Sequence, residues 1–193
     1  MPKKISISPV FEICILTGGL SRRMGRDKAR LRLGNRTMLG HIRATAKATG
    51  LPVRTISRDL IPRCGPLGGI FTALKTTRAH AVLFLACDMP FISPELLIFL
   101  TSKLRRKESA LLTCANRQAG FPFIIPNKQL GIIEKQIARK EFSLQNLAAV
   151  LHARKLGLPP RFAGQLQNIN TPADLERARQ LKAFPGGTSY TSP

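Results

Sequence analysis

The stretch Val10-Phe-Glu-Ile-Cys-Ile-Leu-Thr-Gly-Gly-Leu-Ser-Arg-Arg-Met-Gly-Arg-Asp-Lys28 decides the fold. Its first seven residues form an apolar run, which predicts a buried β-strand over 10–16. Gly18 and Gly19 then allow a tight turn and a close approach of the backbone to a ligand. The loop also gathers cations and ends at Lys28, as a polyphosphate site requires. Its spacing matches neither the P-loop pattern nor the dinucleotide pattern G-x-G-x-x-G.

Segments of strand-like and helix-like pattern alternate along the rest of the chain, which predicts an α/β fold with a mostly parallel sheet. After the first strand we expect further strands at 53–57, 81–87, 110–114, 121–125 and 166–169. Helices are expected at 37–49, 66–76, 93–106, 129–139, 143–152 and 171–184. The length of 193 residues suits one domain, over 10–184. Residues 1–9 form an N-terminal tail, and the low apolar content of 185–193 predicts a disordered C-terminal tail.

Composition bounds the class of protein. Hydrophobic residues make up 44% of the chain, as in a globular protein, and no apolar stretch approaches the roughly 20 residues that span a membrane. No secretory signal is apparent, so we expect a cytoplasmic protein without a membrane partner. The four cysteines lack metal-binding spacing and are interpreted as buried hydrophobic residues, except that Cys64 lies in a loop and could be exposed.

The formal net charge of +21 favours anionic partners such as nucleotides and phosphorylated substrates. Lysine and arginine are spread along the whole chain, which is typical of a solvated surface. No zinc-finger or other nucleic-acid motif is present. We therefore expect any nucleic-acid binding to be nonspecific and to weaken steeply with salt.

Asp88 is the acidic residue with the most informative position. It follows the most apolar predicted strand, and in open α/β sheets ligands bind beyond the carboxyl ends of the strands. Mg²⁺ is typically held by one or two carboxylates together with phosphates and water. Asp88 therefore predicts a Mg²⁺–phosphate site, and the alternative is that it only caps the turn after its strand.

The string Gly18-Gly-x-Ser-x-Arg-Met-Gly-x-Asp-Lys28 resembles the signature of the molybdenum cofactor guanylyltransferases, within the wider group of nucleotidyltransferases. Three later segments agree in order: Gly65-Pro-Leu-Gly-Gly69, Cys87-Asp-Met-Pro90 and Asn168-Ile-Asn-Thr-Pro-Ala-Asp-Leu175. The resemblance covers about residues 10–182. It implies a single-domain, Rossmann-like three-layer sandwich, and Mg²⁺-dependent transfer of GMP from GTP to molybdopterin or the molybdenum cofactor, with release of pyrophosphate.

The resemblance also implies roles for individual residues. Lys28 and Arg23 would hold the β- and γ-phosphates, and with the metal ligand Asp88 they form the catalytic set. Asn168 and Asn170 would lie on the acceptor side, or else only order the loop before the last helix. The residues expected to bind the nucleotide are Leu16, Thr17, Gly18, Gly19, Lys28, Asp59, Gly65, Pro66 and Leu67.

Two features depart from the family pattern. Thr17 replaces an alanine of the first loop, and the segment 50–59 is shorter than usual and lacks an asparagine that helps to hold the base. Asp59 would then select guanine through its N1–H and exocyclic amine. Two alternatives stay open: a nucleotidyltransferase for another base or acceptor, and a shortened relative that binds nucleotides or other anions without catalysis.

Overall fold

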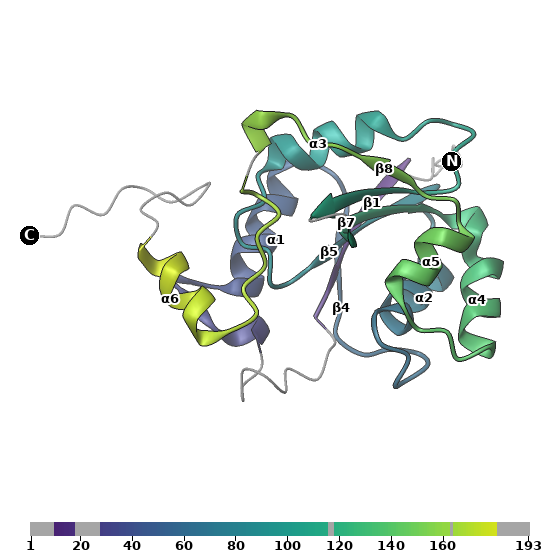
Figure 1. Ribbon diagram of the computed structural model, residues 1–193, viewed down its shortest axis with the longest axis horizontal. Helices are drawn as coiled ribbons and strands as arrows, with labels where there is room; N and C mark the ends of the chain where they lie inside the picture. Colours follow the sequence, from purple (N-terminus) through teal and green to yellow (C-terminus); the bar gives the residue numbers. More distant parts are fainter. Residues whose placement is uncertain (1–9, 18–27, 116–117, 163, 181–193) are drawn as a thin grey trace, which may run out of the picture.

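A central β-sheet organises the protein in this computed structural model. The structure describes residues 10–17, 28–115, 118–162 and 164–180, and at 28, 114–115 and 118–119 it describes the backbone alone. Its six strands lie in the order β4-β1-β5-β7-β6-β8 (Figure 1). They are β1 (Phe11–Leu16), β4 (Val53–Ile56), β5 (Ala81–Ala86), β6 (Leu111–Ala115), β7 (Gln118–Pro126) and β8 (Arg154–Leu156). All run parallel except β7, which pairs antiparallel with both β5 and β6. The predicted α/β fold with a mostly parallel sheet is confirmed.

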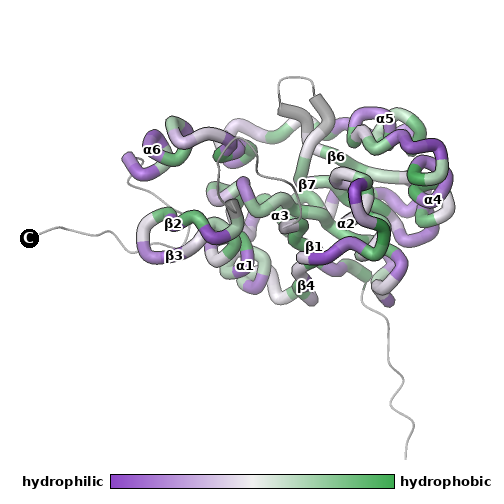
Figure 2. The backbone as a smooth tube through the Cα atoms, turned by 90° about the horizontal axis from the view of Figure 1, so that it is seen from below, coloured by the Kyte–Doolittle hydropathy of each residue, from purple (hydrophilic) through white to green (hydrophobic). Residues whose placement is uncertain are grey.

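Helices cover both faces of this sheet and make a three-layer sandwich (Figure 1). One face packs against α1 (Met38–Ala48) and α3 (Pro94–Lys103). The other packs against α2 (Pro66–Thr76), α4 (Leu130–Ala138) and α5 (Leu144–Val150). Alternate strand residues point to opposite faces, so β1 contributes to both hydrophobic clusters. Figure 2 shows the hydrophobic residues concentrated along the central strands.

A third, smaller hydrophobic cluster lies beside the main sandwich. It joins the hairpin of β2 (Arg32–Leu33) and β3 (Arg36–Thr37) to the last helix, α6 (Pro172–Gln180). Leu33 and Met38 are its fully buried members. Short 3₁₀ turns at Lys28–Arg30, Asn127–Gln129 and Pro160–Phe162 complete the described structure. No helix in these described ranges has the length and apolar character needed to cross a membrane.

The helix starts follow from capping chemistry that is visible in the sequence. Ser93 Oγ accepts from Leu96 N at 3.2 Å, and Pro94 takes the first helical position, where its missing N–H costs nothing. The expected end of that helix, Arg106, was too late, because α3 stops at Lys103. The helix expected from Thr171 is confirmed as far as Gln180, and its predicted continuation lies outside the described residues.

The strand expected at 166–169 was wrong. This segment carries no strand, although Ile169 N donates to the carbonyl oxygen of Asp88 at 2.8 Å. The sheet instead ends with β8, whose three residues Arg154–Leu156 pair with β6. The expectation that Cys64 could be exposed was also wrong, since only 4% of the residue is accessible. Cys14 is fully buried, as expected, and burial raises the pKa of its thiol to about 12.

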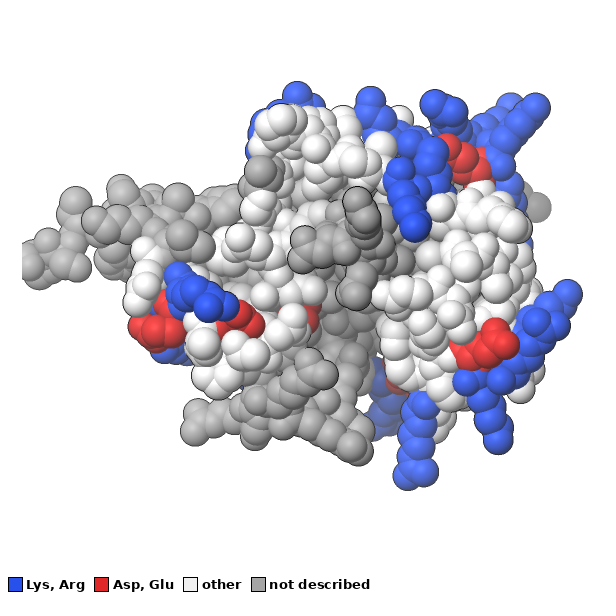
Figure 3. All heavy atoms as spheres, in the orientation of Figure 1, with Lys and Arg blue, Asp and Glu red and all other residues white. Residues whose placement is uncertain are grey.

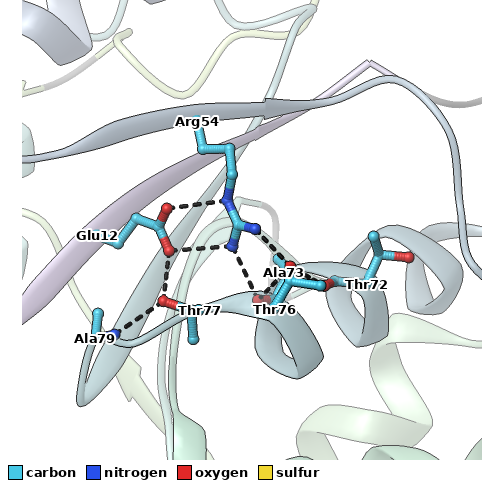
Figure 4. Close-up of polar contacts among 7 residues, drawn as sticks. All are labelled: Glu12, Arg54, Thr72, Ala73, Thr76, Thr77 and Ala79. Atoms are coloured by element: carbon cyan, nitrogen blue, oxygen red, sulfur yellow. Dashed lines mark hydrogen bonds and ion pairs between the residues drawn. The ribbon is translucent and has the colours of Figure 1, made fainter.

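A cluster of polar contacts connects the edge strand β4 to its neighbour β1 and to α2 (Figure 4). Arg54 Nε lies 2.9 Å from Glu12 Oε1 on β1, and its Nη2 donates to Glu12 Oε2 at 3.1 Å. The same guanidinium donates to Ala73 O at 2.9 Å and to the Thr76 hydroxyl. Thr77 Oγ1 donates to Glu12. The cluster thus connects three elements through one half-buried ion pair.

Candidate active site

The carboxyl ends of three neighbouring parallel strands meet at one edge of the sheet. Leu16, the last residue of β1, is in register with Ile56 of β4 on one side and Ala86 of β5 on the other. Thr17 leaves this edge with both its N–H and its hydroxyl donating to Ile56 O, at 3.1 and 3.0 Å. Asp88 follows β5 by two residues at the same edge, which is where open α/β sheets bind ligands.

The first turn of α2 lies against Asp59. Gly65 caps the helix with φ of 55°, a left-handed conformation that favours glycine. A Cβ built on Gly68 would lie 2.6 Å from Asp59 Oδ2 and 2.9 Å from Ile61 O, so only glycine fits here. A Cβ on Gly69 would lie 2.9 Å from the Leu16 side chain. The glycines of 65–69 therefore let a helix start approach both the strand end and a carboxylate.

Four of the nine residues that were predicted to bind the nucleotide line one small recess of about 10 Å³. Its lining residues are Leu16, Ile56, Asp59, Gly65, Pro66 and Gly69. The side chain of Leu67, which was also expected at the nucleotide, is fully buried in the core, so only its backbone could contact a nucleotide and its role stays a prediction. Partial burial raises the pKa of the Asp59 carboxyl.

The short segment after β4 is held in place by α2. Leu60 N donates to Thr72 Oγ1 at 2.8 Å, and Thr72 Oγ1 in turn donates to Gly68 O at 2.8 Å. These bonds fix the backbone next to Asp59 against the first two turns of the helix. The shortened segment therefore still delivers a carboxylate to the recess.

Substituting Gly68 with alanine tests the close approach of α2 to Asp59. The new Cβ must displace both the carboxylate and the Ile61 carbonyl, so we expect the free energy of unfolding to fall by about 1–2 kcal/mol and the recess to open. Chemical denaturation measures the loss.

Gly131→Ala is the matched control. Gly131 lies in α4, and a Cβ added there would meet nothing within 4 Å, so alanine should stabilise the protein by about 0.5–1 kcal/mol through helix propensity. Equal effects of the two substitutions would contradict the close approach at Gly68.

The segment that carries Asn168 and Asn170 lies beside Asp88. Ile169 between them donates its N–H to the Asp88 carbonyl at 2.8 Å. Asp174 Oδ2 accepts from Asn170 N at 3.0 Å and from Thr171 N at 2.8 Å. A hydrogen bond from the Thr171 side chain lowers the pKa of the Asp174 carboxyl, and the hydrogen bond from the Asn170 backbone lowers it further. This capping box fixes the loop next to the predicted metal ligand.

A cavity of about 530 Å³ opens between this loop and α6. Asn168 lines it, and its role on the acceptor side stays a prediction. The sequence interpretation did not identify the other lining residues. These are Phe91, Gln167, Ile169, Asp174, Arg177, Ala178 and Gln180. Asp174, Arg177 and Ala178 are spaced three and four residues apart, so the sequence could have predicted that they share one face of the helix that forms a wall of the cavity.

The Asp88 carboxylate suits a metal ion whose other ligands come from a substrate and from water. In the described part of the chain, no three His, Cys, Asp or Glu side chains are close enough together to hold a metal ion. A single carboxylate at a strand end fits Mg²⁺, which commonly takes one or two carboxylates and completes its octahedron with phosphates and water. It does not fit a closed, all-protein metal site.

The predicted phosphate-binding loop lies largely outside the described residues. Gly18, Gly19 and Arg23 fall in the gap between 17 and 28, and at Lys28 only the backbone is described, at the start of a 3₁₀ turn. Their roles therefore stay predictions. Figure 3 shows lysine and arginine side chains spread around the edge of the molecule in the orientation of Figure 1, as the sequence suggested for a solvated surface.

Comparisons with known proteins identify relatives of this chain in sequence and in fold. Residues 13–155 match the family model of the MobA-like NTP transferase domain. A probable molybdenum cofactor guanylyltransferase of Opitutus terrae is 32% identical and aligns over 88% of this chain and 95% of its own. The crystal structure of molybdopterin-guanine dinucleotide biosynthesis protein A from Archaeoglobus fulgidus superposes with a TM-score of 0.69 at 20% identity, covering 88% of this chain and 97% of that one. A Mycobacterium tuberculosis protein in complex with manganese shares the fold, with a TM-score of 0.59 at 16% identity and coverage of 90% and 100%.

Proposed function

We propose, because this chain belongs to the MobA-like NTP transferase family, that it transfers GMP from GTP to the terminal phosphate of molybdopterin or its molybdenum-loaded form. An oxygen of the acceptor phosphate attacks the α-phosphorus of GTP in line. A new P–O bond forms there while the bond to the bridging oxygen of the β-phosphate breaks, and pyrophosphate leaves. The acceptor phosphate is already anionic, so the step needs positioning and charge stabilisation more than a general base.

One observation carries the proposal: Asp59 and Asp88 reach the same sheet edge, on either side of the β1 carboxyl end. Asp59 lies against the glycine start of α2, and Asp88 follows β5. These positions support the proposal that Asp59 reads the base and that Asp88 binds the metal, because they lie on two sides of the strand end that leads into the glycine loop. The arrangement matches a nucleoside triphosphate whose base and phosphates are held at opposite ends.

Asp59 is the proposed reader of guanine. Its carboxylate can accept from both the N1–H and the exocyclic amine of guanine, a pair of donors that cytosine does not present. Leu16 and Pro66 are its apolar neighbours in the recess, whose volume of about 10 Å³ admits at most the edge of a base. Thr17 and the following glycines would contribute backbone groups at the same strand end.

Asp88 is the proposed protein ligand of Mg²⁺, which when bound would neutralise charge on the triphosphate. Lys28 and Arg23 are the proposed partners of the β- and γ-phosphates. Lysine supplies a point charge, and arginine can bind two oxygens at once. Asn168 and Asn170 are proposed for the acceptor side, where their amides can donate to phosphate oxygens and accept from hydroxyls.

A product assay tests the reaction directly. Purified protein is incubated with Mg²⁺, molybdopterin and each of the four nucleoside triphosphates in turn, and products are identified by mass. We expect the guanylylated acceptor and pyrophosphate with GTP. A product with another nucleotide would move the assignment to a different base, and no product with any of them would overturn the enzymatic function.

Asp59→Ala tests guanine selection separately from turnover. The wild type should prefer GTP to CTP, because the wrong base leaves a partly buried carboxylate without its donors. In the variant we expect the preference to fall by about tenfold or more, while binding of the triphosphate persists. Calorimetric titration with GTP and CTP measures both.

Asp59→Asn is the matched variant, since it keeps the shape against Gly68 and removes the charge. It should also lose the preference for GTP. Equal affinities of the wild type for GTP and CTP would show that Asp59 does not read the base.

A further inference from the structure

The cavity between α6 and the loop 167–169 adjoins the predicted metal ligand. Ile169 belongs to its wall and donates its N–H to the carbonyl oxygen of Asp88 at 2.8 Å. Ile169 is 2% exposed and packs in the small cluster with Leu33 and Leu175. The cavity therefore has a fixed position relative to the carboxyl end of β5. A ligand inside it lies next to the place where the triphosphate is expected.

The walls of this cavity combine four kinds of group, one of which is the Asp174 carboxylate that pairs with Arg177. Phe91, which is partly exposed, provides apolar surface for a planar ring, while Ile169 and Ala178 are each only 2% exposed and close the cavity wall behind it. Gln167, Asn168 and Gln180 carry carboxamides, each of which can donate and accept hydrogen bonds. Arg177 adds a guanidinium whose side chain is 72% exposed. This combination suits a flat heterocycle that has an amide-like edge and carries a negative charge.

Arg177 keeps donors for a ligand despite its ion pair. One Nη2–H binds Asp174 Oδ1, but a guanidinium has five N–H donors. Asp174 Oδ2 is engaged by the backbone of Asn170 and Thr171, so the acid has a structural task that does not depend on Arg177. Removing the Arg177 charge therefore should leave the loop in place and change only what the cavity can hold.

We propose, building on the proposed function, that this cavity binds the acceptor, with Arg177 on its anionic group and the carboxamides of Gln167 and Gln180 on the edge of its pterin-like ring. Phe91 packs against the ring. Arg177 is thereby assigned to acceptor recognition, a role that none of the sequence motifs gave it. Asn168 then lies where the acceptor site meets the metal.

Titration with 6-hydroxymethylpterin monophosphate, followed by pterin fluorescence and by calorimetry, tests this assignment. We expect Arg177→Gln to weaken binding of the pterin phosphate about tenfold or more, because a charge-assisted hydrogen bond is lost. The matched control is Arg179→Gln on the same helix. Arg179 also pairs with an acid three residues earlier, Glu176 at 3.3 Å, but it does not line the cavity. This control should change binding by less than about twofold, as surface charges away from a ligand do.

Three further arms make each outcome decisive. Arg177→Lys should recover part of the affinity, unphosphorylated 6-hydroxymethylpterin should bind more weakly and with little dependence on Arg177, and inorganic phosphate should compete poorly. Equal losses in Arg177→Gln and Arg179→Gln would reduce the effect to general surface charge and overturn the proposal. Failure of the wild type to bind the pterin phosphate, or its displacement by GTP through direct competition, would overturn it as well.

GTP titrations on the same variants separate this proposal from the proposed function. Both Arg177→Gln and Arg179→Gln should bind GTP like the wild type. If the protein fails to transfer GMP yet binds the pterin phosphate through Arg177, the cavity assignment stands and the reaction assignment falls. If transfer proceeds with unchanged KM for the acceptor in Arg177→Gln, the reaction stands and the cavity assignment falls.

Discussion

Replacing Asp88 with asparagine is expected to lower turnover by about 10²–10³-fold, the range found when one electrostatic contact to a reacting group is removed. The amide keeps the size of the side chain but withdraws the negative charge that Mg²⁺ requires. The fold should survive, because the backbone carbonyl of Asp88, which remains in the variant, accepts the hydrogen bond from Ile169. Single-turnover rates at limiting and at saturating Mg²⁺ measure the change, and thermal unfolding checks the fold.

Asp174→Asn serves as the comparison, because Asp174 is the other aspartate close to Asn168 and Asn170 but supports the loop. It should lower turnover less and shift the unfolding transition more. Near-normal turnover of Asp88→Asn at limiting Mg²⁺ would remove Asp88 from the metal site.

Replacing Arg54 with methionine is expected to lower the free energy of unfolding by about 2–3 kcal/mol, somewhat below the cost of breaking a fully buried ion pair. Glu12, with 13% of its side chain exposed, would lose its guanidinium partner. The carbonyl of Ala73 and the hydroxyl of Thr76 would lose a donor as well. Urea denaturation of wild type and variant measures the difference.

Lys75→Met is the matched control. Lys75 forms an ion pair of 3.3 Å with Glu134, but both side chains are about half exposed, at 53% and 45%. Its removal should cost less than about 1 kcal/mol. The double variant Glu12→Leu/Arg54→Met should recover part of the loss, since no unpaired charge remains. A loss in Arg54→Met no larger than in Lys75→Met would show that the cluster contributes little.

The sequence predicted best the elements whose signals are local. The apolar run of β5 and the glycine–proline start of α2 were expected within one residue of the observed bounds, because burial and capping depend on neighbouring residues. The position of Asp88 after β5 followed from the same pattern. That it lies at the same edge as Thr17 follows from parallel pairing, which alternation of strands and helices predicts.

Elements formed by long-range pairing were beyond the sequence. β8 consists of three residues with two cations, and it becomes a strand only because β6 offers it an edge. Residues 166–169 have a strand-like pattern, but Ile169 forms one backbone hydrogen bond to Asp88 and no ladder of bonds to any described strand. Its side chain packs in the third hydrophobic cluster, with Leu33 and α6. The cavity at Arg177 was missed because it forms only where the loop 167–169 folds back toward α6 and meets Phe91, a tertiary arrangement that the local pattern does not encode.

The hydrogen bond from Ile169 to Asp88 joins the walls of two proposed binding sites, so occupancy of one bears on the other. If an acceptor that orders 167–170 tightens Mg²⁺–GTP binding at Asp88 by some factor, thermodynamic linkage requires Mg²⁺–GTP to tighten acceptor binding by the same factor. The two substrates should then show heterotropic cooperativity. Such cooperativity would limit unproductive hydrolysis of bound GTP, because the arrangement competent for transfer becomes populated mainly when both substrates are bound.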